Sequence, residues 1–220
     1  FEKITIDNYR EAFLRGMEEQ KKEIDAIVNN AEAPTFQNTI AALDRSGQLL
    51  NRTAGVFYGL SRSCSTPELQ NLESELSPLL SAHSDYMNMN EGLFLRVKAV
   101  YDGQDKLNLN TEEKRLLEKT YKGFVRGGAM LDDAKKQRRS EINQQLAKLQ
   151  LQFTQNLMHD TNNSYVTVSD VNELEGLPEA DIQKAAALAE RTGAKGQYRF
   201  NMQRPSCNPV LQYAKNRDLR

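Results

Sequence analysis

The chain has 220 residues, of which 39% are hydrophobic and 27% are charged, a composition that suits a globular protein with a sizeable core. Its 29 basic and 30 acidic residues give a formal net charge of −1, which leaves no electrostatic footprint for nucleic acid or an anionic membrane. No stretch approaches the roughly 18 apolar residues of a membrane span. We therefore expect neither nucleic acid nor membrane as a partner.

The N-terminal part predicts two long helices. The first runs from Thr5 to Asn29, because apolar residues recur at helical spacing after a threonine that can cap the start. The second covers residues 36–60, where apolar and small residues alternate steps of four and three: Phe36, Ile40, Leu43, Gly47, Leu50, Ala54, Phe57 and Leu60. This spacing predicts a narrow seam suited to packing along another long helix.

The next helical segment begins at Thr66-Pro67, where a capping residue precedes proline at the first helical position. Its apolar face continues to Val97, with a kink expected at Pro78 and a break near Asn90-Glu91-Gly92. His83 lies on this leucine-rich face, so we expect a core or boundary histidine rather than a metal ligand.

Two further helices are predicted, one from about Thr111 to Arg126 and a long one from Met130 to His159. The basic run at residues 135–139 should be solvated, and a set of apolar residues on the long helix should face the core: Ile142, Leu146, Leu149, Phe153 and Leu157. Long helices joined by short links predict an antiparallel bundle rather than an α/β sheet.

The pattern changes after residue 160. Strands are predicted at residues 164–168 and 198–202, paired as a hairpin-like element, with the helix that ends near Thr192 connecting them. A last helix is expected to start at Pro209, and Arg220 lies only about three turns into it. A helix interrupted in this way suggests that the natural protein continues. The predicted organisation is a bundle (1–160), a small αβ element (161–208) and the start of a helix (209–220), and the fold class is mainly α.

Several short blocks, spread in order along the chain, match a known protein family. They are Phe1–Ile4, Tyr9–Phe13, Glu23–Ile27, the run from Pro34-Thr35-Phe36 to Ser46-Gly47, Leu174–Glu179, Gln203–Ser206 and Tyr213–Arg220. With these blocks the chain resembles the thimet oligopeptidase and peptidyl-dipeptidase family of zinc metallopeptidases, in particular the bacterial peptidyl-dipeptidases. It departs from the family in having Gln197-Tyr198 and no tryptophan, and Cys207 where an aromatic residue commonly follows Pro-Ser.

This resemblance implies the N-terminal, non-catalytic lobe of a longer enzyme. A downstream catalytic lobe of the same chain would carry a His-Glu-x-x-His zinc helix, and the two lobes would flank a channel for short peptides. The complete enzyme would release dipeptides from the C-termini of such peptides. The 220 residues contain no His-Glu-x-x-His and only two histidines, His83 and His159, so no catalytic or metal-binding residue can be assigned. We expect zinc in the complete protein, and no zinc or activity in this fragment.

Two groups of residues are candidates for a functional site. Tyr198, Arg199 and Ser206 are the substrate-channel candidates, because an exposed strand edge can pair with an extended peptide. Four residues from the family-like blocks have a predicted structural or lobe-joint role: Thr35, Asn38, Asn216 and Arg217. Of these, Thr35 should cap the second helix and Asn38 should support the turn before it.

An alternative function is a stand-alone helical bundle that acts as an interaction or scaffold protein, because the seam from Phe36 to Leu60 is coiled-coil-like. A hydrolase formed by this chain alone has almost no support. The sequence leaves the compartment open between cytoplasm and periplasm, with the cytoplasm slightly favoured. Cys64 and Cys207 are expected as reduced thiols, although a bridge between them stays open.

Overall fold

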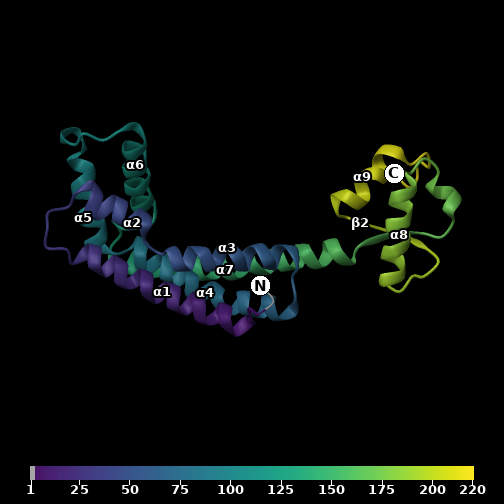
Figure 1. Cartoon of the computed structure of the whole chain (residues 1–220), viewed down its shortest axis with the longest axis horizontal. Helices are drawn as coiled ribbons and strands as arrows, with labels where there is room; N and C mark the ends of the chain where they lie inside the picture. The colour runs from purple at the N-terminus through teal and green to yellow at the C-terminus, as the bar shows by residue number, and fades with distance from the viewer. Residues whose placement is uncertain (1–2) are drawn as a thin grey trace. The chain divides into compact units, whose positions relative to one another are not determined.

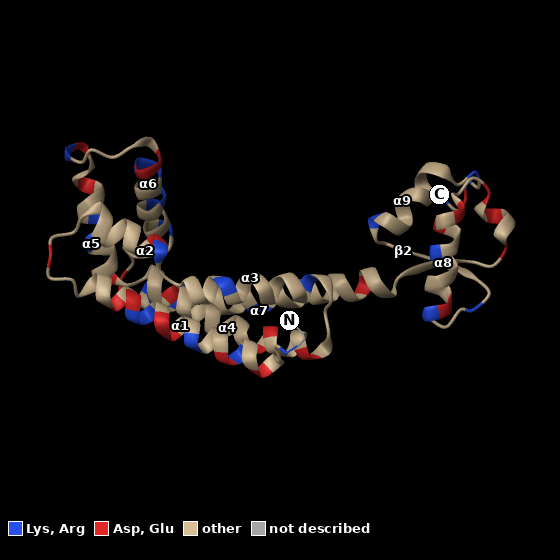
Figure 2. Cartoon of the chain, viewed as in Figure 1, with Lys and Arg blue, Asp and Glu red and all other residues tan. Residues whose placement is uncertain are grey.

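The computed structural model describes residues 3–220, which are mainly helical as predicted. The chain divides into two compact units, unit 1 (Phe1–Leu151) and unit 2 (Gln152–Arg220), so the division lies inside the long helix and before the predicted boundary at residue 160. Figure 1 labels the elements of each unit. Basic and acidic residues are interspersed along both units (Figure 2). Within residues 3–220 no helix is both long enough and apolar enough to span a membrane.

Unit 1 is built from helices. They are α1 (Ile6–Val28), the π-helix η1 (Phe36–Ala41), α2 (Ala42–Arg45), α3 (Gln48–Ser63), α4 (Pro67–Asn88), α5 (Glu91–Asp102), the 3-10 helix η2 (Gln104–Lys106), α6 (Thr111–Arg126) and α7 (Asp133–Asn163), which continues into unit 2. Thr5, Thr66 and Asn90 cap α1, α4 and α5, so the helix starts and the break at residue 90 are confirmed.

The prediction of one helix over residues 36–60 is wrong, because the chain breaks at Ser46-Gly47. Gly47 has φ of +70°, and a Cβ atom there would lie 2.3 Å from the Gln20 amide nitrogen. Its N–H donates to the Glu23 carboxylate at 2.7 Å. The break turns η1 and α3 toward separate cores, which places Ile40 in one core and Phe57 in the other.

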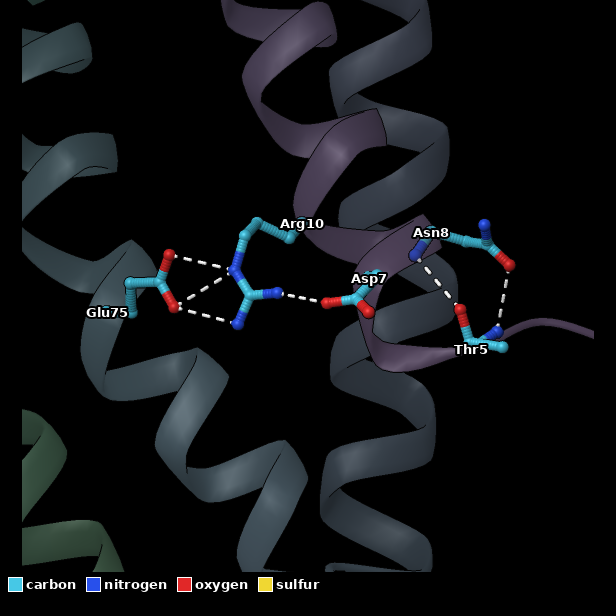
Figure 3. Close-up of polar contacts among 5 residues, drawn as sticks. All are labelled: Thr5, Asp7, Asn8, Arg10 and Glu75. Atoms are coloured by element: carbon cyan, nitrogen blue, oxygen red, sulfur yellow. Dashed lines mark hydrogen bonds and ion pairs between the residues drawn. The ribbon is translucent and has the colours of Figure 1, made fainter.

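The helix α1 contributes to both cores of unit 1. Figure 1 shows α1, α3 and α4 alongside one another. In the core that contains Phe57, the rings of Phe13 and Phe57 pack edge to face with their centres 5.3 Å apart. Near the start of α1, Arg10 joins Asp7 on its own helix to Glu75 on α4, with the Arg10 Nε atom 2.9 Å from the Glu75 carboxylate (Figure 3). This exposed ion-pair group ties α1 to α4, and because solvent screens it, it contributes little to stability.

The prediction that the apolar face of α7 lies in the core is wrong. None of its residues is buried, and the five residues expected inside are 41–69% exposed: Ile142, Leu146, Leu149, Phe153 and Leu157. Asn143 does hold α7 to α4, since its amide donates to the Asp85 carboxylate at 2.7 Å. These five apolar residues belong to none of the three hydrophobic cores found within residues 3–220, and we call them the α7 stripe.

Unit 2 is a small αβ element, as predicted. Strands β1 (Tyr165–Val168) and β2 (Tyr198–Asn201) pair antiparallel, with Val166 opposite Phe200. The 3-10 helix η3 (Val171–Leu174) and α8 (Glu179–Arg191) connect them, and α9 (Arg204–Tyr213) follows. A core on one side of the strands gathers residues from all these elements: Val168, Leu174, Leu177, Ala185, Phe200, Val210 and Ala214.

The prediction for the last helix is wrong at both ends. The helix α9 begins at Arg204 with Pro205 in its first turn, so Pro209 lies inside it, and it ends at Tyr213. Ala214 is extended, and the Lys215 N–H donates to the Glu175 carbonyl at 2.8 Å instead of continuing the helix. Residues 215–220 are therefore held against the η3 region of unit 2. The helix that was expected to run on to Arg220 does not form.

Candidate functional site

A surface cavity of about 170 Å³ lies between α8, β2 and the start of α9 in unit 2. We call it the α8–α9 groove. Charged and hydroxyl residues of all three elements line it: Asp181, Lys184 and Arg191 of α8, Arg199 of β2 and Ser206 of α9. The remaining lining residues are both apolar, among them Leu188 and Pro205, and polar, namely Asn201 and Gln203. The groove is therefore lined by charged, hydroxyl, amide and apolar residues.

Arg199 is held in place by its neighbours. Its Nη1 atom donates to the Thr192 carbonyl at 2.7 Å, and its Nε atom donates to the Thr167 hydroxyl at 3.3 Å. The guanidinium lies 5.0 Å from the centre of the Tyr165 ring, within the range of a cation–π interaction. Because these partners are neutral, the guanidinium keeps an uncompensated positive charge.

Ser206 contributes to the groove but also occupies the strand edge. Its hydroxyl oxygen accepts a hydrogen bond from the Asn201 N–H at 3.0 Å. This N–H is therefore not available to an added strand, which weakens the reason for predicting peptide pairing there. The hydroxyl hydrogen of Ser206 has no acceptor within the described chain, so it can donate to a bound group.

The structure brings together two of the three predicted channel residues. Arg199 and Ser206 both line the groove, whereas Tyr198 is half-buried against the core of unit 2 and does not line it. Sequence reasoning missed Lys184 and Arg191. The spacing of Lys184, Leu188 and Arg191 on one face of the predicted helix was the signal that could have identified them.

The roles predicted for Thr35 and Asn38 in the local fold are confirmed. The Thr35 hydroxyl accepts from the Asn38 N–H at 3.1 Å, and the Asn38 side chain accepts from the Thr35 N–H at 2.8 Å, which is a capping box on η1. Asn38 also donates to the Ala33 carbonyl at 3.0 Å and accepts from Arg96 at 3.3 Å. These bonds fix the turn before η1.

Asn216 and Arg217 lie in the C-terminal turn of unit 2. The Asn216 side-chain oxygen accepts from the N–H groups of Asp218 and Leu219 at 3.0 and 3.4 Å, which shapes this turn. Arg217 is exposed and forms no ion pair with any residue from 3 to 220. A role of either residue at a joint between lobes stays a prediction.

His83 is a core histidine, as predicted. It is 5% exposed, and its Nε2 atom lies 2.8 Å from the side-chain oxygen of Gln20, whose amide donates to the Ser46 hydroxyl at 3.3 Å. Since an amide oxygen can only accept, Nε2 carries the hydrogen, and Nδ1 is buried without a partner in the described chain. Burial, with a smaller contribution from the positive charge of Lys21, lowers the His83 pKa below 6.5.

We expect this histidine to make unit 1 less stable at acid pH. Because the folded pKa lies below the unfolded value, the unfolded chain binds the proton more readily. The free energy of unfolding should therefore fall as the pH decreases below about 6.5, until it passes the folded pKa. Urea titrations at several pH values should show a weaker decrease in His83→Gln than in the unsubstituted chain. The exposed His159 provides the control, because His159→Gln should keep the decrease; equal pH profiles for all three chains would contradict the assignment.

Neither thiol nor acidic residues build a metal centre in the described part of the chain. Among residues 3–220 no group of three His, Cys, Asp or Glu side chains is placed to hold a metal ion. Cys64 is exposed and Cys207 is half-buried, and both are free thiols.

Comparison with known proteins relates the chain to bacterial peptidases. It is 34% identical over 220 residues to dipeptidyl carboxypeptidase of Escherichia coli and to the same enzyme of Salmonella typhimurium, and 28% identical to oligopeptidase A of Escherichia coli. Each match covers the whole of this chain and 32% of the relative's own length. No family model matches. The chain is thus a homologue of the dipeptidyl carboxypeptidases and oligopeptidases A, which confirms the predicted resemblance, and it corresponds to about a third of such a protein.

Proposed function

We propose that this chain is the N-terminal, non-catalytic lobe of a longer peptidase and that it shapes the channel through which peptides reach the active site. The observation that carries the proposal is the similarity to two kinds of peptidase along the whole chain, which spans only 32% of their length. The complete protein would hydrolyse short peptides and release C-terminal dipeptides, as the name dipeptidyl carboxypeptidase implies for the first relatives.

The α7 stripe supports the proposal. Its five apolar residues are 41–69% exposed, and three of them lie in unit 1: Ile142, Leu146 and Leu149. Contiguous exposed apolar residues of this kind typically mark an interaction surface. The remaining part of a longer protein is a natural cover for it.

We further propose that the complete protein uses zinc, held by residues outside this chain. The described residues do not fit such a centre, since a catalytic zinc site needs three protein ligands close together. No step of peptide hydrolysis is therefore assigned to any residue between 1 and 220. The contribution proposed for this lobe is to limit the size of the substrate and to guide it.

The proposal is tested by comparing the complete protein with the 220-residue chain. The complete open reading frame should encode a His-Glu-x-x-His helix, and its product should release dipeptides from an N-acetylated tetrapeptide, measured by mass spectrometry. The 220-residue chain should release none, and a chelator should stop the complete protein. A reading frame that ends at Arg220, or a complete protein that leaves the peptide intact, would favour the scaffold function instead.

A further inference from the structure

We propose that the turn at Ser46-Gly47 is a pH-sensitive hinge of unit 1, which a hydrogen-bond relay from His83 holds closed and which opens when His83 takes up a second ring proton. The proposal goes beyond the proposed function, because it assigns a conformational switch to this lobe itself. The turn joins η1 and α2 to α3, and these elements contribute to different cores. Loosening of the turn therefore changes how the two cores of unit 1 are connected.

The relay runs from α4 through α1 to the turn. The His83 Nε2–H donates to the Gln20 side-chain oxygen at 2.8 Å, and the Gln20 amide donates to the Ser46 hydroxyl oxygen at 3.3 Å. The Ser46 hydroxyl in turn donates to the Leu43 carbonyl at 2.8 Å. The side chains of the relay belong to residues that are only 5–7% exposed, so water does not compete for these bonds. They therefore form one directed chain of donors and acceptors from the histidine to the turn.

A second proton on the ring has no acceptor in this arrangement. The Nδ1 atom of the neutral His83 ring is buried without a hydrogen-bond partner among residues 3–220, so a hydrogen added there would point at no acceptor. A buried charge that lacks a partner costs much more free energy than the same group in water, so the protonated ring should turn out toward solvent. Its departure removes the donor to Gln20, and the Gln20 amide is then free to turn away from Ser46.

The charged groups around His83 do not compensate for the added proton. Burial lowers the His83 pKa, and the positive charge of Lys21 on α1 lowers it further. The nearby acidic residues accept hydrogen bonds from other groups: Asp25 from Tyr86, Glu23 from Gly47 and Asp85 from Asn143 of α7. No carboxylate of α1, α3, α4 or α7 forms an ion pair with the ring within residues 3–220. The proton is therefore opposed by burial and by charge, and nothing holds the ring inside.

The opening should stay local, because the two cores do not depend on the relay. Gly47 has its own connection to α1, since its N–H donates to the Glu23 carboxylate at 2.7 Å. The apolar cores on either side of the turn, with Ile40 in one and Phe57 in the other, contain no group that titrates between about pH 5 and 8. Ser46 also lines a surface cavity between α1 and α2, so the opening would change the shape of this cavity.

The test measures amide hydrogen exchange of the 220-residue chain by mass spectrometry at about pH 7.5 and about pH 5. The chain has only two histidines, so His83 and His159 are the side chains expected to titrate in this range. Exchange rates are converted to protection factors, which removes the intrinsic pH dependence of exchange. Acidification should lower the protection of residues 43–51 about fivefold more than that of α1 and α3, the usual effect of losing one hydrogen bond.

His83→Gln should abolish this local effect, because a glutamine amide can donate to Gln20 but does not titrate. His159→Gln is the matched control and should keep the effect, since His159 is exposed and lies outside the relay. Ser46→Ala removes the end of the relay and should lower the protection of residues 43–51 already at the higher pH. An equal loss of protection in α1, α3 and residues 43–51, no loss at acid pH, or a loss that persists in His83→Gln would overturn the proposal. Unchanged protection in Ser46→Ala would overturn it as well, even if His83→Gln did not fold.

Discussion

Replacement of Gly176 by alanine is expected to destabilise unit 2 by about 3 kcal/mol, at the upper end of what single substitutions usually cost. Gly176 lies between η3 and α8 with φ of +98°, in the region that L-residues avoid. A Cβ atom there would lie 2.2 Å from the carbonyl oxygen of Tyr213, and backbone cannot move aside as a flexible side chain can. The clash would displace the end of α9.

The displaced segment carries several contacts of unit 2. The Lys215 N–H donates to the Glu175 carbonyl at 2.8 Å, and Ala214 is buried in the core. Losing a backbone hydrogen bond costs about 1 kcal/mol, and the strained backbone costs a further 1–2 kcal/mol. The remaining cost comes from moving Ala214 out of its packed position.

The variant Gly193→Ala separates the clash from the strain. Gly193 also has positive φ, +83°, but no atom lies within 4 Å of its added Cβ, so its cost should be about 1 kcal/mol. Hydrogen exchange of the amides in residues 152–220, measured by mass spectrometry, reports the stability of this unit separately. If Gly176→Ala and Gly193→Ala raise the exchange rates equally, the contact with the Tyr213 carbonyl is not the reason for a glycine at position 176.

The sequence predicted local features well because capping and proline effects act within a few residues. Thr5, Thr66 and Asn90 cap helices where expected, and α6 has the predicted bounds. The break at Gly47 could not be read from the periodicity, because it depends on Gln20 and Glu23 of another helix. The end of α9 at Tyr213 likewise depends on the carbonyl of Glu175, which is distant in sequence.

The candidate site was predicted only in part, because some of its residues are indicated by local patterns and others come together only through packing. The alternation of β2 indicated Arg199, and the block that follows indicated Ser206, and both line the groove. Tyr198 was included because alternation does not show which face of a strand meets the core. Arg191 lies on α8, and only the packing of α8 against β2 brings it to the same cavity. A basic residue on an exposed helix face gives no such signal by itself.

Placing lysines in the α7 stripe is expected to have opposite consequences in the short and the complete chain. Leu146 and Leu149 are 47% and 60% exposed. In the 220-residue chain the double variant Leu146→Lys, Leu149→Lys should change the free energy of unfolding by no more than about 0.5 kcal/mol per site, as is usual for surface substitutions. Urea unfolding of the double variant and of the unsubstituted 220-residue chain checks this expectation.

In the complete protein the same variant should cost several kcal/mol, on the proposal that the remaining part covers the stripe. Burying one leucine contributes about 1.5–3 kcal/mol, and an unpaired lysine in its place adds a desolvation cost. Loss of this contact should separate the lobes and reduce peptide hydrolysis, together with a lower Tm.

Leu95→Lys provides the control, because Leu95 is 56% exposed on α5 and is not part of the α7 stripe. It should leave the complete protein as stable and active as before. If the double variant also leaves the complete protein unchanged, the stripe does not meet the rest of the peptidase. The exposed leucines of α7 would then have to contact a separate partner, which is what a scaffold function requires.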